Sequence, residues 1–215
     1  MDFHEEVVLP AEGSVPNIRI RVRELPLADG VHGSTGNQHW PAGTVLAKEL
    51  RRRPSLIQDR FVLDLGAGCG MAGLAAAALG ARRVLLTDGD AETVENMRHN
   101  IAANEHLLGG RGAHVKAQVL DWRDAAAPGF KAMEEQADVV ISSDTVFGHF
   151  GDELARTALK LLDPTGSMIL VAPKDRQTGV PAFVACMKAG GFSVLETSVR
   201  DEAGEAFQIF DLCRR

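Results

Sequence analysis

The 215-residue sequence has no tyrosine, only three cysteines and no long hydrophobic run. Cys69, Cys186 and Cys213 form no Cys-x-x-Cys pair, which excludes a disulfide framework and a zinc ribbon and is typical of a reducing compartment. No apolar run approaches the ~18 residues of a membrane span, and the N-terminus is acidic where a signal peptide is basic. The seven histidines show neither HxxxH nor HExxH spacing, so we expect no metal site. These absences predict a soluble protein of the cytoplasm.

Positive charge is also scarce. Lysine and arginine total 23 against 29 aspartates and glutamates, which gives a formal net charge of −6. An acidic chain binds nucleic acid and anionic membranes poorly, so we expect neither as a partner. Hydrophobic residues make up 45% and charged residues 24%, the composition of an ordinary globular protein. We expect one compact unit, present as a monomer.

From Phe61 onward, short apolar runs alternate with amphipathic or alanine-rich helical segments. Strands that are continuously apolar and alternate with helices are typical of a doubly wound, mostly parallel sheet covered on both faces. The expected strands are 61–65, 84–87, 115–120, 139–142 and 168–172, and the expected helices are 71–79, 91–104 and 152–162. The sequence therefore predicts an α/β fold.

Both ends of the chain depart from this alternation. Residues 192–199 and 206–212 indicate two strands whose connection is too short for a parallel crossover, so the last strand must run antiparallel to its neighbour. A mostly parallel, seven-stranded sheet with a C-terminal antiparallel hairpin is the architecture of class I methyltransferases. At the other end, residues 7–9 and 18–22 predict a short β-hairpin, and Pro41 begins a helix. We therefore divide the chain into a hairpin and loop packed on the main domain (1–40) and a methyltransferase domain (41–215).

A glycine-rich loop follows the first strand of this sheet. It contains Gly66-Ala67-Gly68 and a G-x-G-x-x-G pattern that starts at Gly68, and both suit a cofactor that approaches the backbone closely. Asp88, 20 residues after Gly68, fits either a dinucleotide or S-adenosylmethionine, because both carry a ribose diol. Asp64 separates the two, since it would repel a pyrophosphate but attract the ammonium group of S-adenosylmethionine. The loop therefore favours S-adenosylmethionine as cofactor, with Asp64 near its amino group.

Acidic residues also end the next two strands. Asp88 closes the second strand, where its carboxylate can accept hydrogen bonds from both ribose hydroxyls or can cap the helix that follows. Asp121-Trp122 ends the third strand, beside the expected position of adenine. The indole can stack on the purine and the carboxylate can accept a hydrogen bond from it. A lone tryptophan also fits a core position, so both interpretations of Trp122 stay open.

Five motifs in a fixed order resemble a known family. They are Gly36-Asn-Gln-His-Trp40-Pro-Ala-Gly43, Val62-Leu-Asp-Leu-Gly-Ala-Gly-Cys-Gly70, Leu86-Thr-Asp88, Val119-Leu-Asp-Trp122 and Ser142-Ser-Asp-Thr-Val-Phe147. Together they resemble the seven-β-strand protein-lysine methyltransferases of the methyltransferase-like group (methyltransferase family 16), from about Asn17 to Leu212. The glycine loop alone indicates only a class I methyltransferase, whereas its combination with the other motifs is more specific.

The resemblance implies contacts with S-adenosylmethionine. Trp40 matches a tryptophan that lies over the cofactor, and Gly66, Ala67 and Gly68 match the loop under its methionine moiety. Asp88 matches the ribose ligand and Trp122 the residue beside adenine. Ser143 matches a small residue against the cofactor at the end of the fourth strand.

The same resemblance implies two catalytic residues. Asp144 and Phe147 match the family's Asp-x-x-Tyr, with phenylalanine here in place of tyrosine. We expect Asp144 to accept a hydrogen bond from the incoming amine and Phe147 to form the channel wall. The alternative for Asp144 is that it caps the following helix or its preceding turn.

The expected function is an S-adenosylmethionine-dependent N-methyltransferase that modifies a lysine side chain of a protein substrate. Two alternatives remain open at this point. One is a small-molecule amine N-methyltransferase on the same fold. The other is a non-catalytic scaffold that binds the cofactor, which the change from tyrosine to phenylalanine would suit.

Overall fold

The computed structural model describes residues 3–10, 17–26, 35–108, 114–126, 135–148 and 150–214. Its strands are β1 (Phe3–Leu9), β2 (Ile18–Glu24), β3 (Phe61–Leu65), β4 (Arg83–Asp88), β5 (His114–Val119), β6 (Ala137–Ser143), β7 (Leu162–Pro173), β8 (Phe192–Arg200) and β9 (Ala206–Arg214). Its α-helices are α1 (Pro41–Arg52), α2 (Met71–Ala78), α3 (Ala91–Ala103), α4 (Glu105–Leu108), α5 (Trp122–Ala126), α6 (Phe150–Leu161) and α7 (Val180–Ala189). Short 3-10 helices span Thr35–Asn37 and Pro54–Leu56.

The main sheet has seven strands in the order β5-β4-β3-β6-β7-β9-β8. Neighbouring strands from β5 to β7 are parallel, whereas β9 runs antiparallel to both β7 and β8. The predicted doubly wound sheet and its C-terminal antiparallel hairpin are thus confirmed. The order reverses at β3, which has β4 on one side and β6 on the other. A crevice opens at the carboxyl ends of strands at such a reversal.

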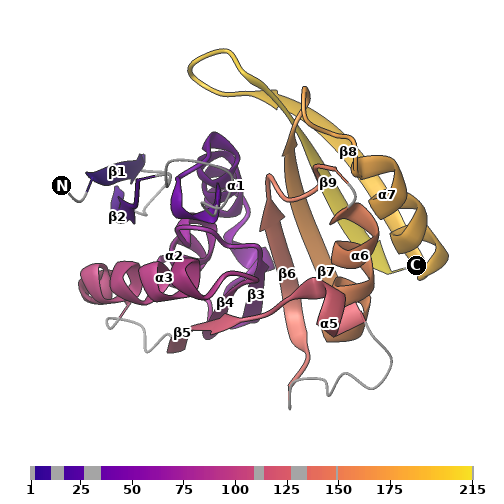
Figure 1. Cartoon of the computed structure of the whole chain (residues 1–215), viewed down its shortest axis with the longest axis horizontal. Coiled ribbons are helices and arrows are strands. Elements are labelled where there is room, and N and C mark those ends of the chain that lie inside the picture. The colour runs from indigo at the N-terminus through magenta and orange to yellow at the C-terminus, as the bar shows by residue number, and fades with distance from the viewer. Residues whose placement is uncertain are drawn as a thin grey trace.

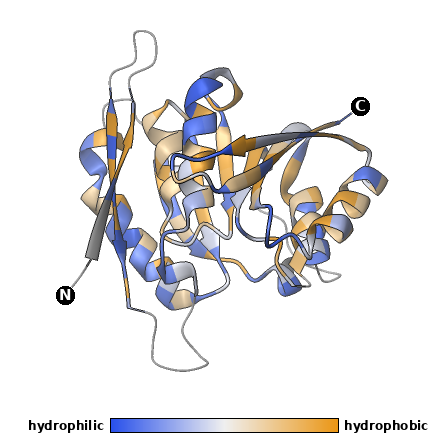
Figure 2. Ribbon diagram, turned by 90° about the horizontal axis from the view of Figure 1, so that it is seen from above, coloured by the Kyte–Doolittle hydropathy of each residue, from blue (hydrophilic) through white to orange (hydrophobic). Residues whose placement is uncertain are grey.

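Helices cover both faces of this sheet, with α1, α2 and α3 on one side and α5, α6 and α7 on the other (Figure 1). All five residues of β3 are buried, as expected for a parallel strand covered on both faces. Val62 on β3 joins the hydrophobic cluster under α1 and α2, while Leu63 and Leu65 join the cluster under α6 and α7. Figure 2 shows apolar strands at the centre, with the hydrophilic residues of the helices turned outward.

The N-terminal hairpin of β1 and β2 is attached to α3 by a ladder of asparagines. Asn100 Oδ1 accepts a hydrogen bond from Arg23 N, and Asn104 Oδ1 accepts one from Arg21 N, at 2.7 and 2.9 Å. Asn96 and Asn104 donate in return to the carbonyls of Arg23 and Arg21. Spacing of four residues places these amides on one face of the helix, where they pair with the free edge of β2 as another strand would.

The observed elements differ from the sequence predictions in a few places. The structure adds α7, where no element was predicted, and extends β7 to twelve residues. The predicted hairpin strands are confirmed, but residues 11–16 between them and residues 27–34 of the loop predicted before residue 40 lie outside the described residues. The division of the chain at residue 40 stays a prediction. No helix that the structure describes is both long and apolar enough to cross a membrane.

Candidate active site

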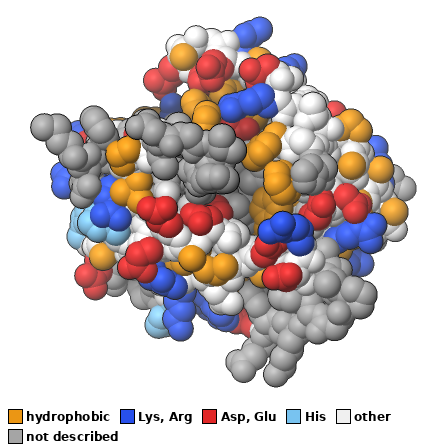
Figure 3. Space-filling view, in the orientation of Figure 1, with side chains coloured by type: hydrophobic (Ala, Val, Ile, Leu, Met, Phe, Trp, Pro, Cys, Tyr) orange, Lys and Arg blue, Asp and Glu red, His pale blue; other side chains and the backbone are white. Residues whose placement is uncertain are grey.

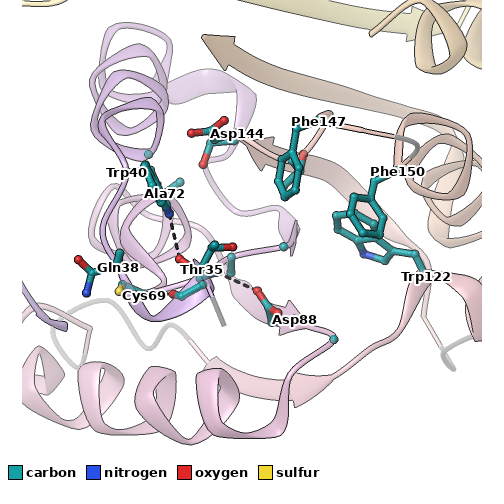
Figure 4. A pocket seen from close by; sticks show the side chains of 18 of the residues that line it. Thr35, Gln38, Trp40, Cys69, Ala72, Asp88, Trp122, Asp144, Phe147 and Phe150 are labelled. Carbon is teal, nitrogen blue, oxygen red and sulfur yellow. Dashed lines mark hydrogen bonds between the residues drawn. The ribbon is translucent and has the colours of Figure 1, made fainter. Parts of the chain in front are cut away.

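A cavity of about 610 Å³ lies at the carboxyl ends of β3, β4, β5 and β6. Ten of the eleven residues predicted for the site line it: Trp40, Gly66, Ala67, Gly68, Asp88, Asp121, Trp122, Ser143, Asp144 and Phe147. Figure 3 shows apolar side chains near the middle of this face of the molecule, with acidic and basic side chains around them. Figure 4 shows how the side chains from different elements converge on the cavity.

The glycine loop forms the floor of the cavity after β3. Gly66 and Gly68 have φ angles of 70° and 55°, in the left-handed region that favours glycine. A Cβ at Gly66 would lie 2.7 Å from Thr145 Cγ2 and 3.0 Å from a carbon of the Trp122 ring. The loop therefore passes so close to Thr145 and Trp122 that a side chain at Gly66 would collide with them.

Asp88 lies at the end of β4, opposite the glycine loop. Its Oδ2 accepts a hydrogen bond from Gly68 N and its Oδ1 one from Asp90 N, both at 3.3 Å. Burial raises the pKa of Asp88, which these amides lower only in part. A carboxylate has about four acceptor sites, so this one can also accept from a diol. The cap of α3 is Asp90, whose Oδ2 accepts from Thr93 N, so the alternative of Asp88 as that cap is wrong.

Asp64 is the predicted site residue that does not line the cavity. The structure therefore does not place Asp64 in direct contact with a cofactor in that cavity. Its side chain is buried, and Oδ2 accepts a hydrogen bond from Gly73 N in the first turn of α2 at 3.0 Å. Side chains alternate along a strand, so Asp64 shares the face of Val62, toward α2. Its carboxylate supports the helix that follows the glycine loop.

Asp64→Asn should alter how stability depends on pH. Burial, partly offset by the Gly73 amide, raises the pKa of Asp64 from its ordinary 3.8 to about 7. Between these values the folded protein binds more protons here than the unfolded chain, so rising pH destabilises the wild-type fold. The free energy of unfolding of Asp64→Asn relative to wild type should therefore increase from about pH 5 to about pH 8 in urea titrations. A difference independent of pH would contradict this expectation.

Asp121 directly precedes α5, and Trp122 is the first residue of that helix. Trp122 lines the cavity and also packs against the hydrophobic cluster of α6 and α7, so both interpretations of this residue stay open. Its buried Nε1 has no hydrogen-bond partner among the described residues. Asp121 forms an ion pair with Arg123 at 2.5 Å, and this hydrogen bond lowers the pKa of Asp121. Its contact with adenine stays a prediction.

Asp144 directly follows β6 and lies at the edge of the cavity. Its φ is 55°, an uncommon backbone conformation that aspartate tolerates, and its N–H donates to Val171 O at 2.9 Å. The side chain is 8% exposed, and Asp144 lies six residues before Phe150, so it is not the N-cap of α6. A role of Asp144 in the turn that precedes this helix stays a prediction. Burial raises its pKa, while the charge of Arg176, 2.9 Å from Oδ2, lowers it.

Aromatic rings lie on both sides of Asp144 (Figure 4). Trp40 precedes α1, and its Nε1 donates to Thr35 O at 2.9 Å. Phe147 is 42% exposed and packs edge-to-face on Phe150, with 5.5 Å between ring centroids. Phe150 and Arg176 were not predicted as site residues, because neither belongs to one of the quoted motifs.

The site fits S-adenosylmethionine. Gly66 and Gly68 line the cavity with backbone alone, Asp88 has acceptor capacity for a ribose, and Trp122 offers a ring and a buried donor beside it. Within the described ranges, no group of three or more His, Cys, Asp or Glu could hold a metal ion. Fold and site together are those of the class I S-adenosylmethionine-dependent methyltransferases.

Comparison with known proteins gives the family. A model described as "Lysine methyltransferase" matches residues 21–189. The chain is 35% identical over 125 residues to a calmodulin-lysine N-methyltransferase of Arabidopsis thaliana, which covers 57% of this chain and 40% of that protein. It is 30% identical over 202 residues to a protein-lysine N-methyltransferase of Schizosaccharomyces pombe, which covers 86% and 65%. This chain belongs to the lysine methyltransferase family.

Solved structures support the fold. The magnesium protoporphyrin IX methyltransferase of Synechocystis, with bound S-adenosylhomocysteine, superposes with a TM-score of 0.59 at 19% identity, over 81% of this chain and 83% of the other chain. The chain spans less than two thirds of the length of the two curated relatives named above.

Proposed function

We propose that this chain transfers methyl groups from S-adenosylmethionine to a lysine side chain of a protein. The observation that carries the proposal is the placement of Asp144 between Trp40 and Phe147 at the edge of the cofactor cavity. A mostly buried carboxylate between aromatic rings attracts an amine and orients it. Membership of the lysine methyltransferase family and the names of the relatives support lysine as the acceptor.

Holding the cofactor falls to residues on four strand ends. Gly66 and Gly68 would lie against its methionine moiety, Asp88 would accept from its ribose, and Trp122 would contact its adenine. Ser143, at the end of β6, would lie on the far side of the same cavity. Bound S-adenosylmethionine supplies an electrophilic methyl group, and its transfer to an amine leaves S-adenosylhomocysteine and a proton.

Asp144 and Phe147 would act on the amine. A lysine in water is protonated, with a pKa of about 10.4, and only the neutral amine has a lone pair to form the new bond. Transfer into an aromatic-walled channel favours loss of that proton. Asp144 Oδ would then accept a hydrogen bond from an amine N–H, so that the lone pair points toward the methyl group. Such alignment is worth up to ~7–11 kcal/mol in well-oriented cases.

Labelling identifies the acceptor. The purified protein is incubated with methyl-labelled S-adenosylmethionine and a cell lysate, and the products are separated by size and digested for mass spectrometry. Methyl-lysine in a labelled protein is the expected result. A labelled small molecule would instead indicate the small-molecule methyltransferase, and cofactor binding without transfer would indicate the scaffold.

Asp88→Ala should weaken cofactor binding. The loss of a charge-assisted contact that leaves two hydroxyls unpaired costs roughly 1.5–3 kcal/mol, or about 10- to 150-fold in affinity. Calorimetric titration with S-adenosylhomocysteine measures this directly. Asp124→Ala is the matched control, because Asp124 is exposed on α5 and outside the cavity lining. Unchanged affinity in folded Asp88→Ala would remove Asp88 from the ribose site.

We also propose that this chain acts on its protein substrate in the cytoplasm. It would do so as a monomer that binds neither nucleic acid nor membrane. The net charge of −6 and three cysteines without a Cys-x-x-Cys pair support this assignment.

A further inference from the structure

Arg176 reaches into the edge of the cavity from the segment between β7 and α7. Its Nη2 lies 2.9 Å from Asp144 Oδ2. Its guanidinium carbon lies 5.0 Å from the centre of the Trp40 ring, in cation–π contact. A cation of the protein itself therefore occupies the position between a carboxylate and an aromatic ring.

The pairing of Arg176 with Asp144 is incomplete. Although the two charges are in contact, Asp144 Oδ2 is buried and accepts no hydrogen bond of good geometry from the described residues. A buried carboxylate oxygen without a donor is costly, and a better-aligned N–H would be favoured there. Arg176 thus neutralises the charge of Asp144 but leaves its hydrogen bond for another donor.

Arg176 can also move away from Asp144 and still lie close to another carboxylate, that of Asp175. Its side chain is 42% exposed, in contrast to the 8% of Asp144, and a second carboxylate lies beside it. Asp175, an exposed residue on the same segment, has its Oδ1 3.9 Å from Arg176 Nε. A rotation of the arginine side chain toward solvent would keep it near a negative charge.

We propose that Arg176 is a built-in occupant of the position for the substrate cation, which an incoming lysine must displace from Asp144 and Trp40. The proposal rests on the proposed function for the identity of that cation. Because Arg176 and the incoming amine compete for Asp144 and Trp40, free amines bind weakly. A lysine that is held by further contacts between the two proteins binds well. Arg176 is therefore a specificity-determining residue.

The two tryptophans of the chain allow a test without turnover. The indole N–H signals of Trp40 and Trp122 are followed by NMR in protein saturated with S-adenosylhomocysteine, and Trp40→Phe assigns them. The probe is n-butylammonium chloride, which carries the end of a lysine side chain, with sodium chloride at equal ionic strength as reference. The variants are Arg176→Gln, Arg176→Lys and Arg156→Gln. Arg156 is the matched control, since its guanidinium pairs with Asp152 on α6, outside the cavity lining.

Arg176→Gln should bind n-butylammonium about tenfold more tightly than wild type, because the competing cation is gone. Arg176→Lys, which keeps a competing charge, and Arg156→Gln should both stay close to wild type. Unchanged or weaker binding in Arg176→Gln would overturn the proposal and show that Arg176 stays in place. Tighter binding by Arg176→Gln without methyl transfer in the lysate would support the role of Arg176 and reject the proposed function. Methyl transfer in the lysate without tighter binding by Arg176→Gln would support the proposed function and reject the role of Arg176.

Discussion

Asp144→Asn should reduce kcat/KM for methyl transfer on the order of 100-fold while S-adenosylhomocysteine binds with nearly wild-type affinity. The substitution removes the charge that orients the amine, and a hydrogen bond to a charged group is worth about 1.5–3 kcal/mol, or about 10- to 150-fold in rate. Cofactor affinity should persist because Asp144 lies at the edge of the cavity, away from Asp88 (Figure 4). Kinetics on the labelled substrate and calorimetry measure the two quantities.

The backbone at Asp144 determines which variants are informative. At a φ of 55°, alanine would add strain of its own, whereas asparagine and glycine both tolerate this conformation. Asp144→Gly therefore removes the carboxylate without backbone strain and should lose at least as much activity as Asp144→Asn. A wild-type rate in either folded variant would remove Asp144 from the reaction.

Phe147→Ala should lower kcat/KM by about tenfold to thirtyfold. The ring packs edge-to-face on Phe150 and borders the cavity beside Asp144, so its removal opens the channel to water. A cation–π contribution of about 0.5–2 kcal/mol would be lost as well, and 2 kcal/mol corresponds to about thirtyfold. Initial rates at several substrate concentrations test this, with S-adenosylhomocysteine affinity as the control for folding.

Phe147→Tyr separates the ring from the hydroxyl that the family pattern has at this position. If the ring face is what acts, the variant should have nearly the wild-type rate, since at 42% exposure a hydroxyl can be accommodated in solvent. A gain of an order of magnitude or more would show that the hydroxyl orients the amine. That result would favour the scaffold interpretation for the natural chain.

Much of the fold followed from local patterns. The limits of β3 were predicted to the residue, because a run of five residues that is apolar except for Asp64, between a polar segment and a glycine loop, indicates a strand buried on both faces. The antiparallel direction of the last strand followed from the length of its connection. By contrast, α7 was left unassigned, and the cap of α3 is Asp90 rather than the neighbouring Asp88. Two acids two residues apart give the same sequence signal, and only their backbone geometry tells them apart.

The candidate site was predicted in composition more than in arrangement. The motifs gave ten residues that line one cavity, because the carboxyl ends of parallel strands meet at the same edge of the sheet. Asp64 was placed near the cofactor by its charge, but its strand turns it toward α2. Phe150 and Arg176 carry no motif of their own, so nothing local marked them.

The sequence by itself determined the class of fold, the cofactor and the family, since these depend on short-range patterns such as apolar runs, a glycine loop and an acid at a strand end. Only the tertiary structure decided which charges meet. Arg176, Asp144 and Trp40 come from three separate segments and are brought together by the strand order of the sheet. Side-chain periodicity is local, whereas electrostatic pairing depends on distances in space, and those exist only once the chain has folded.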